Sequence, residues 1–162
     1  MKLRALEQRD APLMLQWMHD ESVVSHLGTN FMEKTIDDCR RFIDWANTTD
    51  TDLHLAVVDD AGEYMGTVSL KHIHNGTAEF AITVRACAMG KGFSKFGMAS
   101  ILEKGIQELG LSAIYWCVSR YNARAVRFYD KNGYVRTEAV PQTILNAYTP
   151  EQQADFIWYA YR

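Results

Sequence analysis

The stretch from Val84 to Lys95 has the composition of a turn that binds phosphate. Its residues, VRACAMGKGFSK, connect a predicted strand to a predicted helix and include glycines at positions 90 and 92. The first amides of a helix lack partners inside the helix and lie at the positive end of its dipole, and glycines let a pyrophosphate approach the backbone. The pattern fits a phosphate site and a plain connecting turn equally well. It matches neither the GxGxxG nor the Walker sequence, which argues against dinucleotide binding and nucleotide hydrolysis.

Metal and disulfide chemistry are not expected. His54, His72 and His74 have no matching carboxylate pattern, so they do not define a metal site. The cysteines are odd in number and far apart, which fits neither a disulfide framework nor a paired CxxC site. They are Cys39, Cys87 and Cys117.

Length and charge limit the class of protein. A chain of 162 residues fits one domain, expected over residues 1–162, and 48% apolar residues can fill its core. A net charge of -3 does not favour a nucleic-acid partner. No apolar run is long enough to span a membrane, and the N-terminus lacks the pattern of a signal peptide, so we expect a cytoplasmic protein without a membrane partner.

Charge is unevenly distributed along the chain. Residues 1–84 hold seven Lys and Arg against fourteen Asp and Glu, whereas residues 85–131 hold eight against three. An acidic half followed by a basic segment suits a protein that holds a cationic acceptor beside an anionic co-substrate, although solvated surface charge explains most such asymmetries.

Helical spacing of apolar residues predicts four helices. Asp10 is expected to cap the first, which has Pro12 in its first turn, and Thr35 to cap the second. A third runs from Gly92 to Leu109, and a fourth follows Asn122, which is expected to cap it. The inward stripe of the third helix is predicted as Phe96, Ala99, Leu102, Ile106 and Leu109, with Gly110 ending the helix.

Strands are predicted between these helices. Asn75-Gly76 is the strongest turn signal in the chain, and a symmetric hairpin there would place His72 opposite Glu79, whereas a bulged loop would break that pairing. A polar loop with two prolines separates the last two strands. The predicted strands are Lys2–Ala5, Leu53–Val58, Glu63–Ile73, Ala78–Val84, Ala113–Val118, Tyr134–Val140 and Ala154–Tyr161. Together these elements predict a mixed α/β sheet with an antiparallel meander and one strand-helix-strand crossover.

The glycine turn, together with the later run NARAVRFYDKNGY that begins at Asn122, resembles the acetyl-CoA signature of GNAT acetyltransferases. The family's first motif is Arg or Gln, two residues, Gly, one residue, then Gly or Ala, and it maps onto Met89, Gly92 and Ser94. Two of its three positions depart from the pattern, and Met89 removes a usual polar side chain. The second motif matches more closely. The resemblance implies an α/β (α+β) fold with a mixed, mostly antiparallel central sheet flanked by helices.

The resemblance also implies how acetyl-CoA is bound as co-substrate. The backbone of Ile82, Thr83 and Val84 is expected to bond the pantetheine arm. Asn122 is expected to touch the co-substrate near its thiol end, and Arg124 to add positive charge toward the phosphates. The pyrophosphate is expected on the amides of Met89, Gly90, Lys91, Gly92, Phe93, Ser94 and Lys95. The family's reaction needs no metal.

Amine acetylation calls for a proton acceptor and a proton donor. A lysine-like amine has a pKa near 10.4 and must lose a proton to attack a thioester, and the resemblance gives Glu79 that role, directly or through a water. An ordinary cross-strand contact between Glu79 and His72 explains the residue equally well. The leaving thiolate, whose thiol has a pKa near 8.5, gains from protonation, and Tyr129 holds the family's position for that acid. The backbone amide near Val84 could polarise the thioester carbonyl.

Three functions fit the sequence. The first is acetylation of a small-molecule amine, such as a polyamine, an amino sugar or an aminoglycoside-like compound. The second is acetylation of a protein N-terminus, including those of ribosomal proteins, and the third is a non-catalytic acyl-CoA-binding module. The acceptor-selecting residues are expected in Val23–Phe31 and Thr143–Gln153, which contain no known motif. The aromatic strand Phe156–Tyr161 suits a homodimer interface as well as a core.

Overall fold

Alternation of apolar residues along the strands builds one central sheet. A computed structural model describes residues 1–162 and shows a seven-stranded sheet in the order β1-β2-β3-β4-β5-β7-β6. Every neighbouring pair is antiparallel except β4 and β5, which are parallel. The strands are β1 Lys2–Ala5, β2 Leu53–Val58, β3 Tyr64–His74, β4 Thr77–Val84, β5 Ala113–Ser119, β6 Val135–Arg136 and β7 Phe156–Tyr161. The mixed, mostly antiparallel sheet predicted from the sequence is confirmed.

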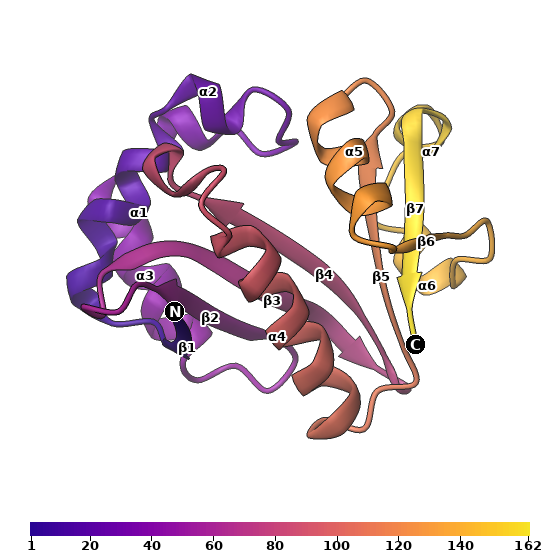
Figure 1. Ribbon diagram of the computed structural model, residues 1–162, viewed down its shortest axis with the longest axis horizontal. Coiled ribbons are helices and arrows are strands. Elements are labelled where there is room, and N and C mark those ends of the chain that lie inside the picture. Colours follow the sequence, from indigo (N-terminus) through magenta and orange to yellow (C-terminus); the bar gives the residue numbers. More distant parts are fainter.

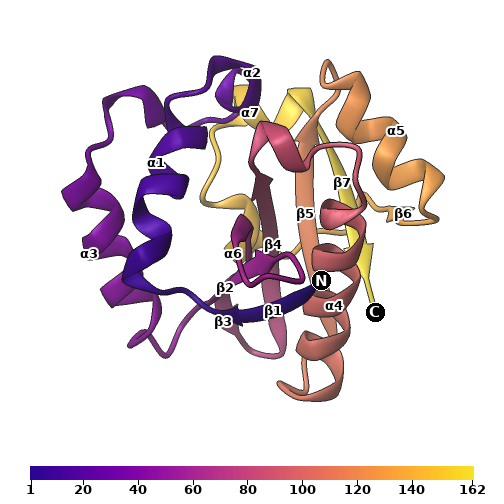
Figure 2. The same ribbon diagram turned by 60° about the vertical axis from the view of Figure 1, so that its left-hand side comes forward.

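Helices cover both faces of this sheet (Figures 1 and 2). α1 and α3 lie on one face, and α4 and α5 lie on the other. Short 3-10 turns at Gln8–Asp10, Phe31–Glu33 and Ala86–Ala88 connect the elements. The helices are α1 Ala11–Met18, α2 Glu21–Val24, α3 Ile36–Ala46, α4 Phe93–Gln107, α5 Ala123–Lys131, α6 Gln142–Leu145 and α7 Pro150–Asp155. No helix combines the length and the apolar character needed to cross a membrane.

The β4–β5 pair is the feature of the sheet that shapes the site. The two strands pair only through Thr77–Glu79 and Ala113–Tyr115, at the start of each strand. Beyond these residues the ladder stops, and β4 and β5 diverge (Figure 1). We call the unpaired parts, residues 80–84 and 116–119, the open end of the β4–β5 pair.

α4 packs against the sheet through glycines. Gly97 and Gly105 are buried with four larger residues, whereas Ala99 and Leu109 of the predicted stripe are exposed, so that part of the prediction is wrong. A Cβ atom at Gly97 would lie 2.7 Å from Val57 Cγ2. The missing side chains therefore let the helix approach the strands closely, which rotates its buried side away from the stripe that apolar spacing suggests.

Capping follows the sequence at α3 but not at α1. The Thr35 side chain accepts a hydrogen bond from the Asp38 N–H, and Asp38 reciprocates, so α3 begins with a capping box as expected. Asp10 precedes α1 but its carboxylate does not cap that helix. It instead accepts hydrogen bonds at 2.7 and 2.8 Å from Arg4, because a buried carboxylate is better satisfied by a guanidinium.

The hairpin between β3 and β4 contains a bulge. The turn at 75–76 has two positive φ angles, 49° and 76°, as expected for Asn-Gly. His72 also has a positive φ, 54°, and the ladder shifts between Lys71 and His74. Glu79 consequently pairs with Lys71, so the predicted pairing with His72 is wrong.

The C-terminal third differs most from its prediction. The segment predicted as a polar loop forms α6 and α7, with Pro141 before the first and Pro150 opening the second, a position that suits proline. The strand predicted from Tyr134 shortens to the two residues of β6. β7 lies between β5 and β6, and its residues Trp158, Tyr159 and Ala160 are buried in the core.

Candidate active site

Backbone groups at the open end of the β4–β5 pair lack strand partners. The Arg85 N–H donates to the Met65 carbonyl at 2.8 Å, and the β3–β4 register continues this alternation back along β4. Odd-numbered residues such as Thr83 therefore bond to β3, while Ile82 and Val84 direct their N–H and C=O groups toward β5. Because the β4–β5 ladder has ended there, these groups are free to bind a ligand laid along the strand.

The turn after β4 leads into a helix start that no side chain caps. Gly90 and Gly92 have φ angles of 74° and 88°, a conformation that glycine adopts without strain. Gly92 is the N-cap residue of α4 and has no side-chain bond, so the first amides of a 15-residue helix are unsatisfied. Lys91 and Lys95 are exposed beside them. The arrangement can hold an anion such as a diphosphate.

α5 lies beside this turn. Arg124 Nη1 is 3.3 Å from the sulfur of Met89, which joins the start of α5 to the glycine turn. The Asn122 side chain accepts a hydrogen bond from the Ala125 N–H at 3.2 Å and so caps α5. The structure thus brings together the two segments that carry the predicted co-substrate residues, although they lie about 30 residues apart in the chain.

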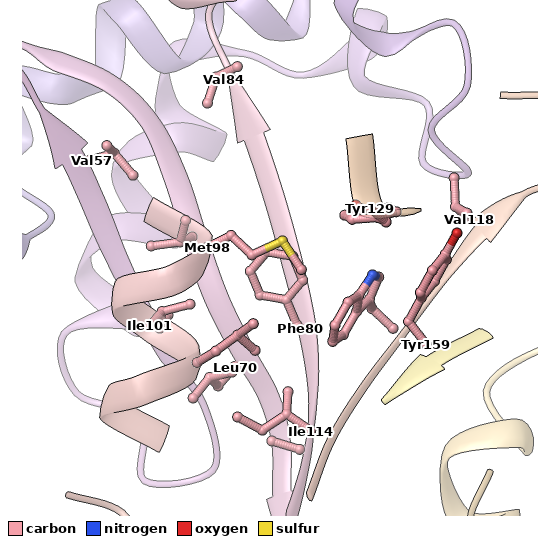
Figure 3. Close-up of a cluster of buried hydrophobic side chains, with 14 of the residues drawn as sticks. Val57, Leu70, Phe80, Val84, Met98, Ile101, Ile114, Val118, Tyr129 and Tyr159 are labelled. Carbon is pink, nitrogen blue, oxygen red and sulfur yellow. The ribbon is translucent and has the colours of Figure 1, made fainter. Parts of the chain in front are cut away.

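Tyr129 occupies the aromatic cluster at the open end. Figure 3 shows it between Val84 on β4 and Val118 on β5, and its ring centroid lies 5.7 Å from that of Trp116. Its ring is buried, and its hydroxyl makes no hydrogen bond within the chain although a small part of it stays accessible. Burial raises the pKa of Tyr129, which keeps the phenol protonated at neutral pH.

Glu79 lies on the opposite face of the sheet and is 3% exposed. Its carboxylate accepts a short hydrogen bond from the Tyr148 hydroxyl, and His72 Nδ1 is 3.7 Å from its other oxygen. The contact with His72 therefore survives the bulge, in a different geometry from the predicted one. Tyr148 was not predicted as an individual residue, although it belongs to the segment 143–153 singled out from the sequence. Burial raises the pKa of the Tyr148 hydroxyl.

A cavity of about 330 Å³ lies on the same face as Glu79. α1 and α3 supply its apolar side, and β3 and β4 supply its floor, where Thr67 and Ser69 lie beside Ala81 and Thr83. Glu79 itself does not line this cavity. Its lining is Met14, Trp17, Met18, Thr29, Phe31, Lys34, Asp38, Cys39, Phe42, His54, Thr67, Ser69, Lys71, Ala81, Ile82 and Thr83.

The family follows from comparison of the sequence with family models. The model of the acetyltransferase (GNAT) domain matches residues 1–135. The chain belongs to the GNAT acetyltransferase family. This family is the one that the glycine turn and the run from Asn122 resemble, and its members are acyltransferases.

Solved structures of GNAT enzymes share the fold. The spermidine N-acetyltransferase of Vibrio cholerae in complex with CoA and spermine has a TM-score of 0.76 and 24% identity, over 86% of this chain and 83% of that chain. A mutant form of the same enzyme has a TM-score of 0.75 and 22% identity, over 99% of this chain and 94% of that chain. A structure of that enzyme with manganese ions has a TM-score of 0.72 and 22% identity, over 99% of this chain and 91% of that chain. No curated protein matches the sequence.

Proposed function

We propose that this GNAT protein transfers an acetyl group from acetyl-CoA to a primary amine of a small molecule. The observation that supports this proposal most directly is that Ile82 borders both the open end of the β4–β5 pair and the cavity. Its backbone groups are free at the open end of the β4–β5 pair, and the same residue lines the cavity on the other face. A donor laid along β4 and an amine in the cavity would therefore meet at one point of the sheet.

Acetyl-CoA supplies the acetyl thioester, and the chain offers groups that fit its parts. The uncapped amides of α4 and the exposed Lys91 and Lys95 suit the diphosphate. Ile82 and Val84 have the free backbone groups that an extended pantetheine arm requires, and Thr83 between them is held in the ladder with β3. Asn122 and Arg124 lie at the start of α5, across from the turn.

Tyr129 is the proposed proton donor to the leaving thiolate. It stays protonated at neutral pH and its hydroxyl has no internal partner that would have to be released. Glu79 is the proposed proton acceptor for the amine. Because its carboxylate is bonded to Tyr148 and lies off the cavity wall, the proton would reach it through a water.

The cavity favours a small acceptor over a protein N-terminus. Helices α1 and α3 form one wall of a space of about 330 Å³, which is the size of a small-molecule pocket. The spermidine N-acetyltransferase with the same fold acts on a polyamine, and the acidic excess of residues 1–84 is consistent with a cationic amine. An alternative without catalysis, a module that only binds acyl-CoA, leaves the buried Glu79 and the polar floor of the cavity unexplained.

A panel of amines tests this proposal. Spermidine, amino sugars, an aminoglycoside and peptides with free N-termini are each incubated with acetyl-CoA, and free coenzyme A thiol is measured. We expect release with at least one small amine and little release with the peptides. Acetyl-CoA binding without any acetylation would favour the non-catalytic module.

Gly92→Glu is the matched control for that assay. A Cβ atom at Gly92 meets only the end of the Met1 side chain, at 3.6 Å. A glutamate there would put a negative charge at the α4 amides, where the diphosphate is proposed to bind. The positive φ adds strain of about 1 kcal/mol, so the variant should still fold. We expect calorimetry to show no acetyl-CoA binding by this variant. Unchanged affinity in the folded variant would place the phosphate site elsewhere.

A further inference from the structure

A buried chain of three polar residues opens into the acceptor cavity. The Ser69 hydroxyl lies 2.6 Å from Nδ1 of His54, and Nε2 of His54 lies 3.3 Å from Oδ2 of Asp52. All three side chains are less than one-tenth exposed. Ser69 and His54 line the cavity, whereas Asp52 lies behind them.

The geometry fixes the tautomer of His54. A carboxylate can only accept, so Nε2 must carry the hydrogen that is donated to Asp52. Nδ1 is then an acceptor, and the Ser69 hydroxyl donates to it. His54 is thus bonded on both sides, to Ser69 and to Asp52. The Ser69 oxygen, at the cavity end of this series, retains a free lone pair. That lone pair can accept a proton from a bound amine.

The position of Ser69 places this oxygen beside the reaction point. Ser69 pairs with Ala81 in the β3–β4 ladder, one residue before Ile82. The side chains of Ser69 and Ala81 leave the same face of the sheet, and both border the cavity. Glu79 is two residues further back along β4 and is bonded to Tyr148.

We propose that His54 takes up the proton of the acceptor amine through the Ser69 hydroxyl, with Asp52 holding the imidazole in its receptive tautomer. This inference rests on the proposed acetyl transfer and assigns the amine proton to His54 in place of Glu79. As the N–C bond forms, the amine proton passes to the Ser69 oxygen and the Ser69 proton passes to Nδ1 of His54. As the C–S bond breaks, the thiolate takes a proton from Tyr129. His54 then releases its proton to solvent and Tyr129 regains one from solvent, so both groups return to their starting forms and no co-reactant is needed.

The surroundings of His54 suit a base at neutral pH. Burial lowers its pKa below the usual value, although Asp52 opposes the shift, and the neutral form therefore predominates near pH 7. Phe42 and Trp45 on α3 pack against the ring, with centroids 5.0 and 5.3 Å away, and hold its orientation. The other charged or titratable groups around it are Lys71 on β3 and Lys34, Asp38 and Cys39 beside the cavity.

The pH dependence of turnover tests this role. Because burial lowers the pKa of His54, its basic form is lost only at a pH below the ordinary range of histidine, so wild-type kcat should fall only in that acidic range. His54→Gln keeps a polar side chain but cannot take a proton, so we expect kcat at pH 7 to fall about 10²-fold and the acidic limb to disappear. Acetyl-CoA affinity should not change, because His54 lies away from the α4 amides.

Two further variants keep the test informative if His54→Gln does not fold. Ser69→Ala removes the link between amine and imidazole and should reduce kcat by a similar factor. Asp52→Asn keeps the shape but removes the charge that favours the imidazolium, so the acidic limb should move to lower pH. His74→Gln, at an exposed position in the hairpin, is the control and should behave as wild type.

The outcomes separate this inference from the proposed function. An active wild type with unchanged kcat and pH profile in folded His54→Gln overturns the relay and leaves Glu79 as the base. If kcat of His54→Gln falls by the same factor at every pH and the acidic limb is retained, the relay is also overturned, because His54 then has a structural role. If no amine is acetylated by the wild type, the proposed function itself fails.

Discussion

Single side chains in this protein combine burial with an unused polar atom, and Tyr129 is the clearest example. Its ring is held by Trp116 and Tyr159, with centroids 5.7 and 5.1 Å away, while its hydroxyl has no partner. A buried tyrosine normally satisfies its hydroxyl, because an unpaired buried polar atom is costly. The unpaired hydroxyl of Tyr129 is thus available to a ligand at the open end of the β4–β5 pair.

Tyr129→Phe should separate catalysis from stability. The change removes an oxygen that bonds nothing in the chain, so the free energy of unfolding should stay within about 0.5 kcal/mol of wild type. Turnover should fall about 10²-fold, the scale of one positioned proton donor, with acetyl-CoA affinity retained. Steady-state kinetics and thermal unfolding check the two halves of this prediction.

Tyr159→Phe is the matched control for that variant. The Tyr159 hydroxyl donates to Asp130 at 3.0 Å in the same cluster, so its removal should lower stability by about 1 kcal/mol and leave turnover nearly unchanged. Full activity in Tyr129→Phe would remove this residue from the mechanism.

Among the helices and strands, features set by neighbouring residues could be predicted from the sequence, whereas features set by distant residues could not. The caps at Thr35 and Asn122 and the Asn-Gly turn depend on a few neighbouring residues, and the structure shows them as the sequence predicts. The bulge at His72 depends on Asp52, which accepts its N–H from 20 residues away at 3.1 Å. The contact between Tyr148 and Glu79 spans 69 residues. No pattern within one element could reveal either contact.

The buried glycines of α4 provide a prediction at this scale. Gly97→Ala would place a Cβ 2.7 Å from Val57 and 3.0 Å from Val68, both fully buried and β-branched. Alanine favours a helix by about 1 kcal/mol over glycine, but overpacking costs about 1 to 3 kcal/mol. We expect a lower free energy of unfolding in urea, by about 1 kcal/mol.

Ala99→Gly is the reverse change on the exposed side of the same helix. It should lower the free energy of unfolding by about 1 kcal/mol, because glycine has a lower helix propensity than alanine and the exposed site makes no tight contact. If Gly97→Ala were instead stabilising by a similar amount, α4 would not pack as closely on β2 and β3 as the structure shows.

The whole molecule consists of two parts of one sheet that are joined at one end. β1 to β4 form the first part and β5 to β7 the second, and only three residues of each strand pair across the junction. The basic segment 85–131 contains α4 and α5, which cover one face, and the acidic segment 1–84 contributes α1 and α3 on the other. An anionic donor and a cationic acceptor would thus approach from opposite faces and meet at the open end.

Hydrogen exchange can test whether acetyl-CoA closes this open end. The amides of Ile82 and Val84 have no strand partner, so they should exchange rapidly in the free protein. A pantetheine arm bonded along β4 would protect them. With ligand at 100 times Kd only about 1% of the protein is free, so exchange through the free form should slow about 100-fold.

The turn at 75–76 serves as an internal reference, because it lies at the opposite end of β4 and its exchange should not respond to the ligand. Gly92→Glu serves as the second reference and should show no protection at any ligand concentration that saturates the wild type. Protection at α4 without protection of Ile82 and Val84 would mean that the phosphates bind as proposed while the acyl arm takes another path. In that case the cavity beside Ile82 would no longer face the thioester, and the small-amine acceptor site would have to be sought along the new path.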